Sequence, residues 1–205
     1  MQEYFCRPGH AFLRFITALG GGQETADYLD RLERVVVPNI GRLVDRARAR
    51  GNLVVITEFG GPDTADEADL PPWAQRHNGM ATDLIGESIY PPVTDAVART
   101  IVELAPQPTD LVLPRSTSGP LAGTDVAARM RAAGVGRVVV TGVATDVCVT
   151  GWVRELADSG FTVSLPVDAC ASPLRRCHET ALEMTIPAFA MLTETTALLS
   201  TQVTR

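Results

Sequence analysis

The segment from Val138 to Cys148 has the clearest potential for chemistry in this sequence. A run of apolar residues ends at Gly142, a tight turn follows, and a helical pattern begins near Asp146, so Cys148 falls in the first helical turn. Ligands bind at the carboxyl edge of open parallel sheets, where such a strand ends. The N–H groups and the dipole of a helix start favour a thiolate and can hold a developing oxyanion. The segment therefore indicates a cysteine nucleophile, and the alternative is a small buried cysteine of the core.

The elements that must position Cys148 follow from the hydrophobic pattern. Apolar runs alternate with helical patterns, which predicts a parallel sheet covered by helices on both faces. Strands are predicted at 53–57, 111–113, 138–141, 162–167 and 190–193. Helices are predicted from Pro38 to Gly51, over 124–134, over 146–159 and around His178. Residues 60–92 are rich in Gly, Pro and Asp and are expected to form a long irregular loop that could cover a pocket.

Composition sets limits on the function. The chain has 205 residues, of which 45% are hydrophobic, so a single domain over 1–205 is expected. The net charge is −6, which argues against a nucleic-acid partner, and no run of about 20 apolar residues suggests a membrane helix. All 18 basic residues are arginine, which excludes Schiff-base chemistry and a lysine phosphate clamp. The cysteine and histidine spacings do not match a metal site, and the start does not look like a signal peptide, so a metal-free cytoplasmic protein is expected.

Four segments resemble one family in order and spacing. Gly142-Val-Ala-Thr-Asp-Val-Cys-Val149 resembles the nucleophile motif of the isochorismatase-like cysteine hydrolases, a superfamily that includes nicotinamidases and N-carbamoylsarcosine amidohydrolases. The start, Met1-Gln-Glu-Tyr-Phe5, resembles the end of the family's Asp-Met-Gln-x-x-Phe motif. Gly123-Thr124 and the stretch from Asp168 to His178 resemble two further family segments.

The resemblance implies a Rossmann-like three-layer α/β/α fold with a six-stranded parallel sheet and an Asp–Lys–Cys triad. It makes Cys148 the nucleophile and places a cis peptide bond between Val143 and Ala144. The N–H groups of Ala144 and Cys148 would then form the oxyanion hole. Substrate contacts are expected from four residues, of which the last could equally belong to the core: Gln2, Phe5, Val143 and Trp152.

The chain departs from the family pattern at two members of the triad. The family's aspartate would come directly before Met1, so its strand and its carboxylate are expected upstream of the given sequence; the alternative is a short form that has lost them. Arg115 falls at the family's lysine position, where it would keep the positive charge but could not transfer a proton; the alternative is an ordinary loop arginine. Thr57-Glu-Phe-Gly60 replaces the metal-ligand pattern of nicotinamidases, so no catalytic metal is expected.

Two functions from different classes remain open at this point. The first is a cysteine-dependent hydrolase of a small amide, carbamoyl or related C–N bond, without a cofactor. The second is a catalytically inactive small-molecule-binding protein of the same family. A homo-oligomer, dimer or tetramer, is expected from the family and from strand edges that a missing first strand would expose.

Overall fold

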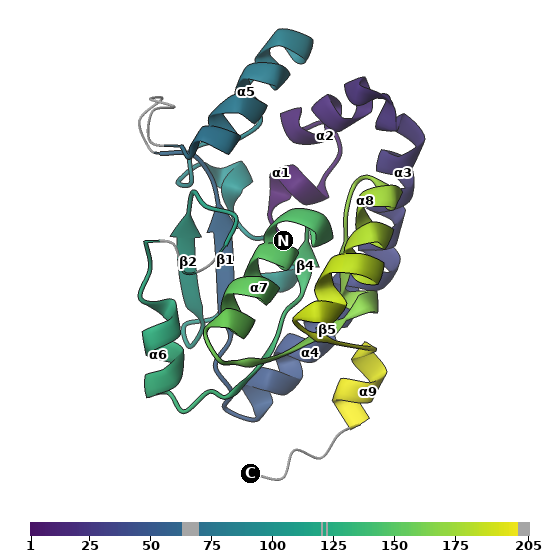
Figure 1. Cartoon of the computed structure of the whole chain (residues 1–205). Coiled ribbons are helices and arrows are strands. Elements are labelled where there is room, and N and C mark those ends of the chain that lie inside the picture. Colours follow the sequence, from purple (N-terminus) through teal and green to yellow (C-terminus); the bar gives the residue numbers. More distant parts are fainter. Residues whose placement is uncertain (63–69, 120, 122, 201–205) are drawn as a thin grey trace.

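The computed structural model describes residues 1–62, 70–119, 121 and 123–200 (Figure 1). It contains parallel strands between helices, as the alternating pattern predicts. The strands are β1 (Val55–Phe59), β2 (Leu111–Arg115), β3 (Arg137–Val139), β4 (Gly142–Val143), β5 (Thr162–Pro166), β6 (Cys170–Ala171) and β7 (Met191–Thr193). Five of them coincide with the predicted strands, and β4 and β6 are two-residue strands that hydrophobic runs cannot reveal.

The described helices include four π-helical turns and several short 3-10 turns. The α-helices are α1 (Glu3–Cys6), α2 (Ala11–Ile16), α3 (Gly22–Arg31), α4 (Val37–Ala49), α5 (Pro72–Ile85), α6 (Val126–Ala132), α7 (Thr150–Asp158), α8 (Arg175–Thr180) and α9 (Thr195–Ser200). The π-helical turns are η1 (Thr17–Gly21), η2 (Leu32–Val36) and η6 (Thr145–Val149), with a further one at η8 (Ala181–Thr185). The 3-10 turns are η4 (Ala96–Ala98), η5 (Val102–Leu104), η7 (Val167–Ala169) and η9 (Ile186–Ala188). None of the described helices is long and apolar enough to cross a membrane.

The strands form three separate parallel ladders. β1 pairs with β2, β5 lies between β3 and β7, and β4 pairs with β6. Within the described ranges no ladder joins β1 to β3. Val139, on β3, is 46% exposed, which is unusual for a strand with helices on both sides.

The start of the chain contacts the carboxyl end of β1. The Gln2 side chain donates to the Phe59 carbonyl at 2.8 Å and accepts from the Phe59 N–H at 2.9 Å. The Met1 carbonyl accepts from the Ile101 N–H at 3.0 Å, and Gln2 forms an antiparallel bridge with Thr100. Gln2 therefore takes the hydrogen-bonding place of a neighbouring strand at Phe59.

Helices cover the strands on two faces. On one face, Val163 and Leu165 of β5 pack in an apolar cluster with Val126 of α6 and Val153 of α7. On the other face, a second cluster combines residues of α3, η2 and α4 with Ala169 and Ala171, which flank Cys170 of the first cluster. Alternate residues of an extended strand point to opposite faces, so Cys170 and its two neighbours connect the two layers.

One prediction about a helix start is wrong. Pro38 does not begin a helix, because α3, η2 and α4 run on from Gly22 to Ala49 and the π-helical turn η2 precedes the proline. In η2 the N–H of Val37 donates to Leu32 O, five residues back, so the backbone has already left the regular α pattern before Pro38, which has no N–H.

The region from 60 to 92 is not wholly irregular. It contains α5, which begins at Pro72 and ends at Ile85. Gly86 caps the end of this helix with a φ of +75°. In Figure 1, α5 and α2 lie side by side beyond the carboxyl ends of β1 and β2. Residues 63–69 of the predicted loop lie outside the described part of the chain.

Candidate active site

Cys148 lies where β4 turns into a helix. The Val143–Ala144 peptide bond is cis, which confirms the position expected from the resemblance. After it, η6 and α7 form a continuous helix from Thr145 to Asp158. The Ala144 carbonyl accepts the N–H groups of Val147 and Val149, each at 3.1 Å, on either side of Cys148. The half-buried Cys148 therefore belongs to the first turn of a long helix, as predicted.

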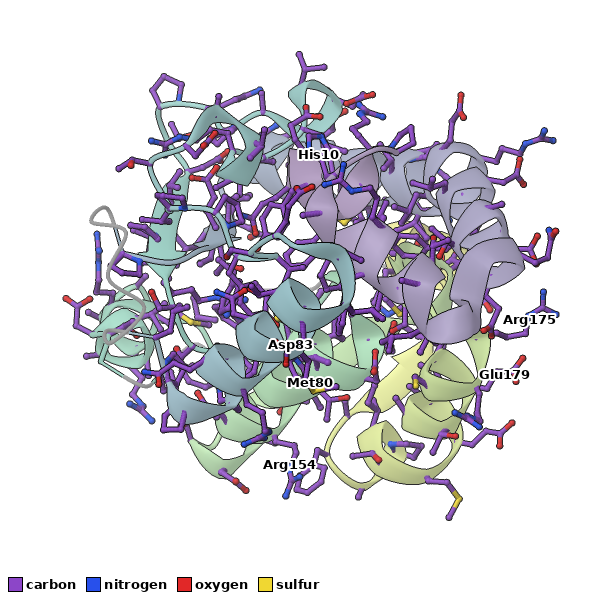
Figure 2. All side chains as sticks on the ribbon, turned by 90° about the horizontal axis from the view of Figure 1, so that it is seen from above. His10, Met80, Asp83, Arg154, Arg175 and Glu179 are labelled. Carbon is purple, nitrogen blue, oxygen red and sulfur yellow. The ribbon has the colours of Figure 1, made fainter. Side chains whose placement is uncertain are left out.

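Side chains behind the turn hold it in place. Thr145 is fully buried, and its hydroxyl lies 2.9 Å from Nδ1 of His178. The Ser172 hydroxyl donates to a carboxylate oxygen of Asp146 at 2.5 Å. Arg175 and Glu179 of α8 project outward (Figure 2), whereas His178 of the same helix turns inward to Thr145. His178 is thus a support of the Cys148 turn, and it does not line the cavity described next.

Cys148 opens into an aromatic cavity of about 160 Å³. Its polar or titratable side chains are those of His77, Tyr90, Asp146 and Cys148. The remaining wall is apolar apart from the backbone and is made by Phe5, Phe12, Phe15, Ile16, Phe59, Trp73, Ile89, Ala144, Val147, Pro173 and Leu174. Such a wall suits a small, flat, uncharged group beside the thiol.

Among the residues expected to bind substrate, only Phe5 lines this cavity. Gln2 is 3% exposed, and its amide is used by backbone groups of Phe59 and Ala98. Val143 packs in the apolar cluster of α3 and α4. Trp152 lies one helical turn beyond Cys148, but its side chain packs against the cluster of α6 and α7 and does not line the cavity.

Arg115 is buried next to the cavity wall. Its guanidinium lies over the Phe59 ring, 5.5 Å from the ring centroid, and donates to the Thr117 carbonyl. It makes no salt bridge with any acid in the described part of the chain, and its Nε has no hydrogen-bond partner there. An unpaired buried cation is costly, so Arg115 is available to interact with a negative charge that forms nearby.

Arg115 and Cys148 act on the same buried hydroxyl. Burial raises the pKa of Tyr4 well above its ordinary value; the charges of Cys148 and Tyr90 raise it further, and the charge of Arg115 lowers it. The Tyr4 hydroxyl donates to the Phe59 carbonyl at 3.0 Å. The charges of Cys148, Tyr90 and Arg115 therefore all act on the pKa of Tyr4.

Comparison with known proteins decides the family. Residues 1–197 match the model of the isochorismatase domain. The chain belongs to the isochorismatase family. This confirms the family that the resemblance indicated and makes the chain a member of a hydrolase family.

Solved structures share the isochorismatase fold with this chain. A cysteine hydrolase from Pseudomonas syringae pv. phaseolicola superposes with a TM-score of 0.73 and 21% identity, over 97% of this chain and 87% of the other. An isochorismatase family protein from Desulfovibrio vulgaris gives 0.72 and 20%, over 97% and 92%. The pyrazinamidase/nicotinamidase of Streptococcus mutans gives 0.67 and 18%, over 94% and 95%.

Three residues that line the cavity together with Cys148 were not assigned to the site from the sequence. They lie on α5 and on the segment after it. Trp73, His77 and Tyr90 all line the cavity, and His77 Nδ1 lies 3.1 Å from the Tyr90 hydroxyl. The available signal was a helix start at Pro71-Pro72, followed by Trp73 and His77 one turn apart.

Within the described ranges a single carboxylate lines the cavity, and no cluster of metal ligands is present. Glu58 is 2% exposed and is occupied by Arg99 and Thr100, while Glu3 pairs with Arg7 at 3.4 Å. Asp146 is the one acid among the described residues that line the cavity. No group of three His, Cys, Asp or Glu side chains in the described ranges is placed to hold a metal ion.

Proposed function

We propose that this chain is a cysteine hydrolase that cleaves a small amide, carbamoyl or related C–N bond. The observation that carries the proposal is the position of Cys148, in the first turn of a long helix beside the cis peptide and facing the aromatic cavity. The Pseudomonas relative is itself described as a cysteine hydrolase, and the Streptococcus relative as a pyrazinamidase/nicotinamidase. The first name agrees with a cysteine nucleophile, and the second agrees with an amide substrate.

In this proposal the Cys148 sulfur attacks the carbonyl carbon and forms a tetrahedral intermediate. The N–H groups of Ala144 and Cys148 hold the oxyanion, a role in which a single donor contributes about 10²–10³-fold in rate. The intermediate expels the amine and leaves a thioester, which water then hydrolyses. Arg115 stabilises the negative charge through its guanidinium and cannot exchange a proton at neutral pH.

The aromatic wall of the cavity limits the substrate. An uncharged planar amide or ureide would bury its ring or its plane against Phe5, Phe59 and Trp73. A charged group placed against these three rings would lose its hydration without a polar partner there. We therefore propose a small uncharged molecule as the substrate of a cytoplasmic, homo-oligomeric enzyme.

A substrate screen with paired variants tests this function. Primary amides, ureides and cyclic amides are incubated with the wild type, Cys148→Ala and Cys177→Ala, and the released amine or ammonia is measured. Cys177 is half-buried on α8 and does not line the cavity, so it is the matched control. We expect hydrolysis by the wild type and Cys177→Ala and none by Cys148→Ala. Binding of these compounds without turnover by any variant would favour the inactive binding protein instead.

A further inference from the structure

The cavity beside Cys148 contains few polar side chains. His77 contributes an imidazole, Tyr90 a hydroxyl and Asp146 a carboxylate. The rest of the described wall is apolar apart from the backbone and the indole N–H of Trp73. A few polar groups in an apolar cavity determine how a ligand is oriented, so these side chains decide what the cavity selects.

His77 and Tyr90 form a hydrogen-bonded pair in the wall of the cavity. Nδ1 of His77 lies 3.1 Å from the Tyr90 hydroxyl. The Tyr90 ring packs edge-on against Phe59 at a centroid distance of 5.1 Å. The His77 ring packs edge-on against Trp73 at 5.8 Å. Each ring is therefore held by an aromatic neighbour as well as by the hydrogen bond.

A hydrogen bond between neighbouring residues fixes the register of the pair. The buried Asn78 follows His77 in α5, and its side-chain oxygen accepts the Ile89 N–H at 3.0 Å. Ile89 directly precedes Tyr90. This bond ties the segment after α5 to the helix, so two residues 13 positions apart meet in the cavity wall.

The burial of Tyr90 decides which nitrogen of His77 carries the proton. Tyr90 is 7% exposed, and a buried hydroxyl needs an acceptor for its proton. Among the described residues, Nδ1 of His77 is the one acceptor within hydrogen-bonding distance of this hydroxyl. Nδ1 therefore accepts from Tyr90, and the proton of the neutral imidazole is on Nε2.

The electrostatic surroundings keep the pair in this uncharged state at neutral pH. Burial lowers the pKa of His77 below its ordinary 6.5, and the adjacent Arg76 lowers it further. Burial raises the pKa of Tyr90, and the charge of Cys148 raises it further, so the hydroxyl keeps its proton. The pair thus presents one neutral N–H donor.

This donor is available to a ligand. Among the described residues, the bond to Tyr90 is the one hydrogen bond of the His77 ring, so Nε2 has no acceptor there. His77 is half-buried and lines the cavity. A desolvated donor without an acceptor is unfavourable, and a ligand atom that accepts the proton removes this cost.

We propose that His77 is a specificity-determining residue of the cavity and donates its Nε2–H to an acceptor atom of the substrate other than the scissile carbonyl oxygen. The substrate class is then a neutral planar amide or ureide that carries a second acceptor, such as a ring nitrogen or an oxo group. Tyr90 is a positioning residue, because its hydroxyl keeps the His77 proton on Nε2. The proposal rests on the hydrolase function proposed above and concerns recognition alone, with no part in the proton transfers at Cys148.

The second acceptor is distinct from the scissile oxygen because the two are held by different elements. In the proposed mechanism the scissile oxygen lies at the turn after β4, where the N–H groups of Ala144 and Cys148 hold it. His77 belongs to α5, which forms a separate part of the wall. A planar substrate between these elements is fixed at both ends, which orients its carbonyl toward the thiol.

Trp73 and Asp146 are the competing polar groups. The indole N–H of Trp73 is a second donor in the wall, and it would select the same kind of ligand. The Asp146 carboxylate is an acceptor and would select a donor instead, but it already accepts the Ser172 hydroxyl at 2.5 Å. Variants of both residues therefore belong in the test.

The test measures the Kd of matched probes by isothermal titration calorimetry. Cys148→Ala is the parent, so that no probe is consumed. Benzamide is compared with the three pyridine carboxamides, which have the same shape and one ring nitrogen at different positions. Imidazolidinone is compared with hydantoin, which adds a second carbonyl oxygen. The quantity of interest is the preference, the ratio of the two Kd values within a pair.

Five further substitutions are made in this parent. His77→Phe removes the donor and keeps an aromatic ring, whereas His77→Gln keeps an N–H donor. Trp73→Phe and Asp146→Asn test the competing groups. His10→Gln is the matched histidine control, because His10 precedes α2 and does not line the cavity. Circular dichroism and thermal melting establish that each variant is folded.

We expect at least one probe with a second acceptor to bind about 3- to 10-fold more tightly than its partner, which is what one neutral hydrogen bond provides. His77→Phe should remove this preference, and His77→Gln should keep part of it. His10→Gln and Asp146→Asn should keep all of it. A merely structural role of His77 would weaken both members of a pair equally and leave the ratio unchanged.

The outcomes separate recognition from hydrolysis. Equal Kd values within every pair, or a preference that persists in folded His77→Phe, would overturn the role of His77. Loss of the preference in Trp73→Phe but not in His77→Phe would overturn it in favour of the indole. A preference that depends on His77, in a protein whose wild type hydrolyses nothing in the screen, would overturn the hydrolase function and leave the recognition standing.

Discussion

The side-chain amide of Gln2 pairs with both backbone groups of Phe59, as a neighbouring strand would. Its nitrogen donates to the Phe59 carbonyl at 2.8 Å, and its oxygen accepts the Phe59 N–H at 2.9 Å. The same nitrogen donates to the Ala98 carbonyl. One buried side chain therefore joins the chain start to two segments 57 and 96 positions away.

Replacement of Gln2 by alanine should destabilise the protein. The change leaves buried groups of Phe59 and Ala98 without their partner, and an unsatisfied buried polar group costs about 1–3 kcal/mol. We expect the free energy of unfolding to fall by at least about 2 kcal/mol in urea denaturation. Gln23→Ala is the control, since Gln23 is exposed and bonds only to Asp27, four residues away; its effect should stay within about 0.5 kcal/mol. Equal effects of the two variants would contradict the role of Gln2.

Iodoacetamide at pH 7 should label Cys148 before the other three cysteines. Burial raises the pKa of Cys6 and of Cys177, and it raises that of Cys170 to about 11. The thiolate is the reactive form, so these three thiols are slow at neutral pH. Peptide mass spectrometry over a time course measures the order. Equal labelling of Cys148 and Cys177 in the native protein would count against a special environment at Cys148.

Arg115 should be important for reactivity and unimportant for stability. Its buried guanidinium has no acidic partner in the described ranges, and an apolar replacement removes a desolvated charge. Arg115→Met is therefore expected to unfold at a urea concentration no lower than the wild type while its kcat/KM falls by about 10²-fold or more. Arg115→Lys should retain part of the activity, because it keeps the charge without the planar fork. A loss of stability in Arg115→Met without a loss of reactivity would show a structural role.

Stability at low pH should depend on Asp110. Burial alone would raise its pKa, but hydrogen bonds from Arg48 and from the Gln107 N–H outweigh this and hold the pKa below 3.8. The carboxylate is therefore stabilised in the folded state, and its contribution is fully present above pH 3.8 and is lost as the pH falls through the lower folded pKa.

We expect Asp110→Asn to cost about 1.5–3 kcal/mol at pH 6, the range for hydrogen bonds to charged groups. The difference from the wild type should shrink toward pH 2. Asp45→Asn is the control, because the Asp45 carboxylate is 80% exposed and 3.9 Å from the same Arg48. Urea denaturation across this pH range measures both variants, and a constant difference for Asp110→Asn would refute the linkage.

The sequence predicted the strands and the Cys148 turn because both depend on local patterns. Apolar runs located five strands, the turn after Gly142 located the helix start, and the family resemblance of this motif located the cis bond. The π-helical turn before Pro38 has no such local signature, so a helix start was predicted where the helix runs on. The prediction of a homo-oligomer stays untested.

The cavity could not be predicted from local patterns, because it is assembled from distant segments. Phe5, Phe59, His77 and Tyr90 come from a helix, a strand end, α5 and the segment after it. Trp152 shows the opposite case. Its position one turn after Cys148 suggested the cavity, but its side chain packs against the apolar cluster of α6 and α7. Only the tertiary arrangement decides which aromatic residues meet the thiol.

The unpaired edge of β1 has a consequence for amide hydrogen exchange. In a parallel ladder alternate residues bond to opposite neighbours, and Val54 and Gly60 bond toward β2. The N–H groups of Ile56 and Glu58 share that side, so they should exchange slowly with deuterium. Those of Val55 and Thr57 point to the edge that no described strand covers and should exchange orders of magnitude faster. Phe59 should be slow as well, because its N–H is held by Gln2, and that protection should vanish in Gln2→Ala while the protection of Glu58 persists.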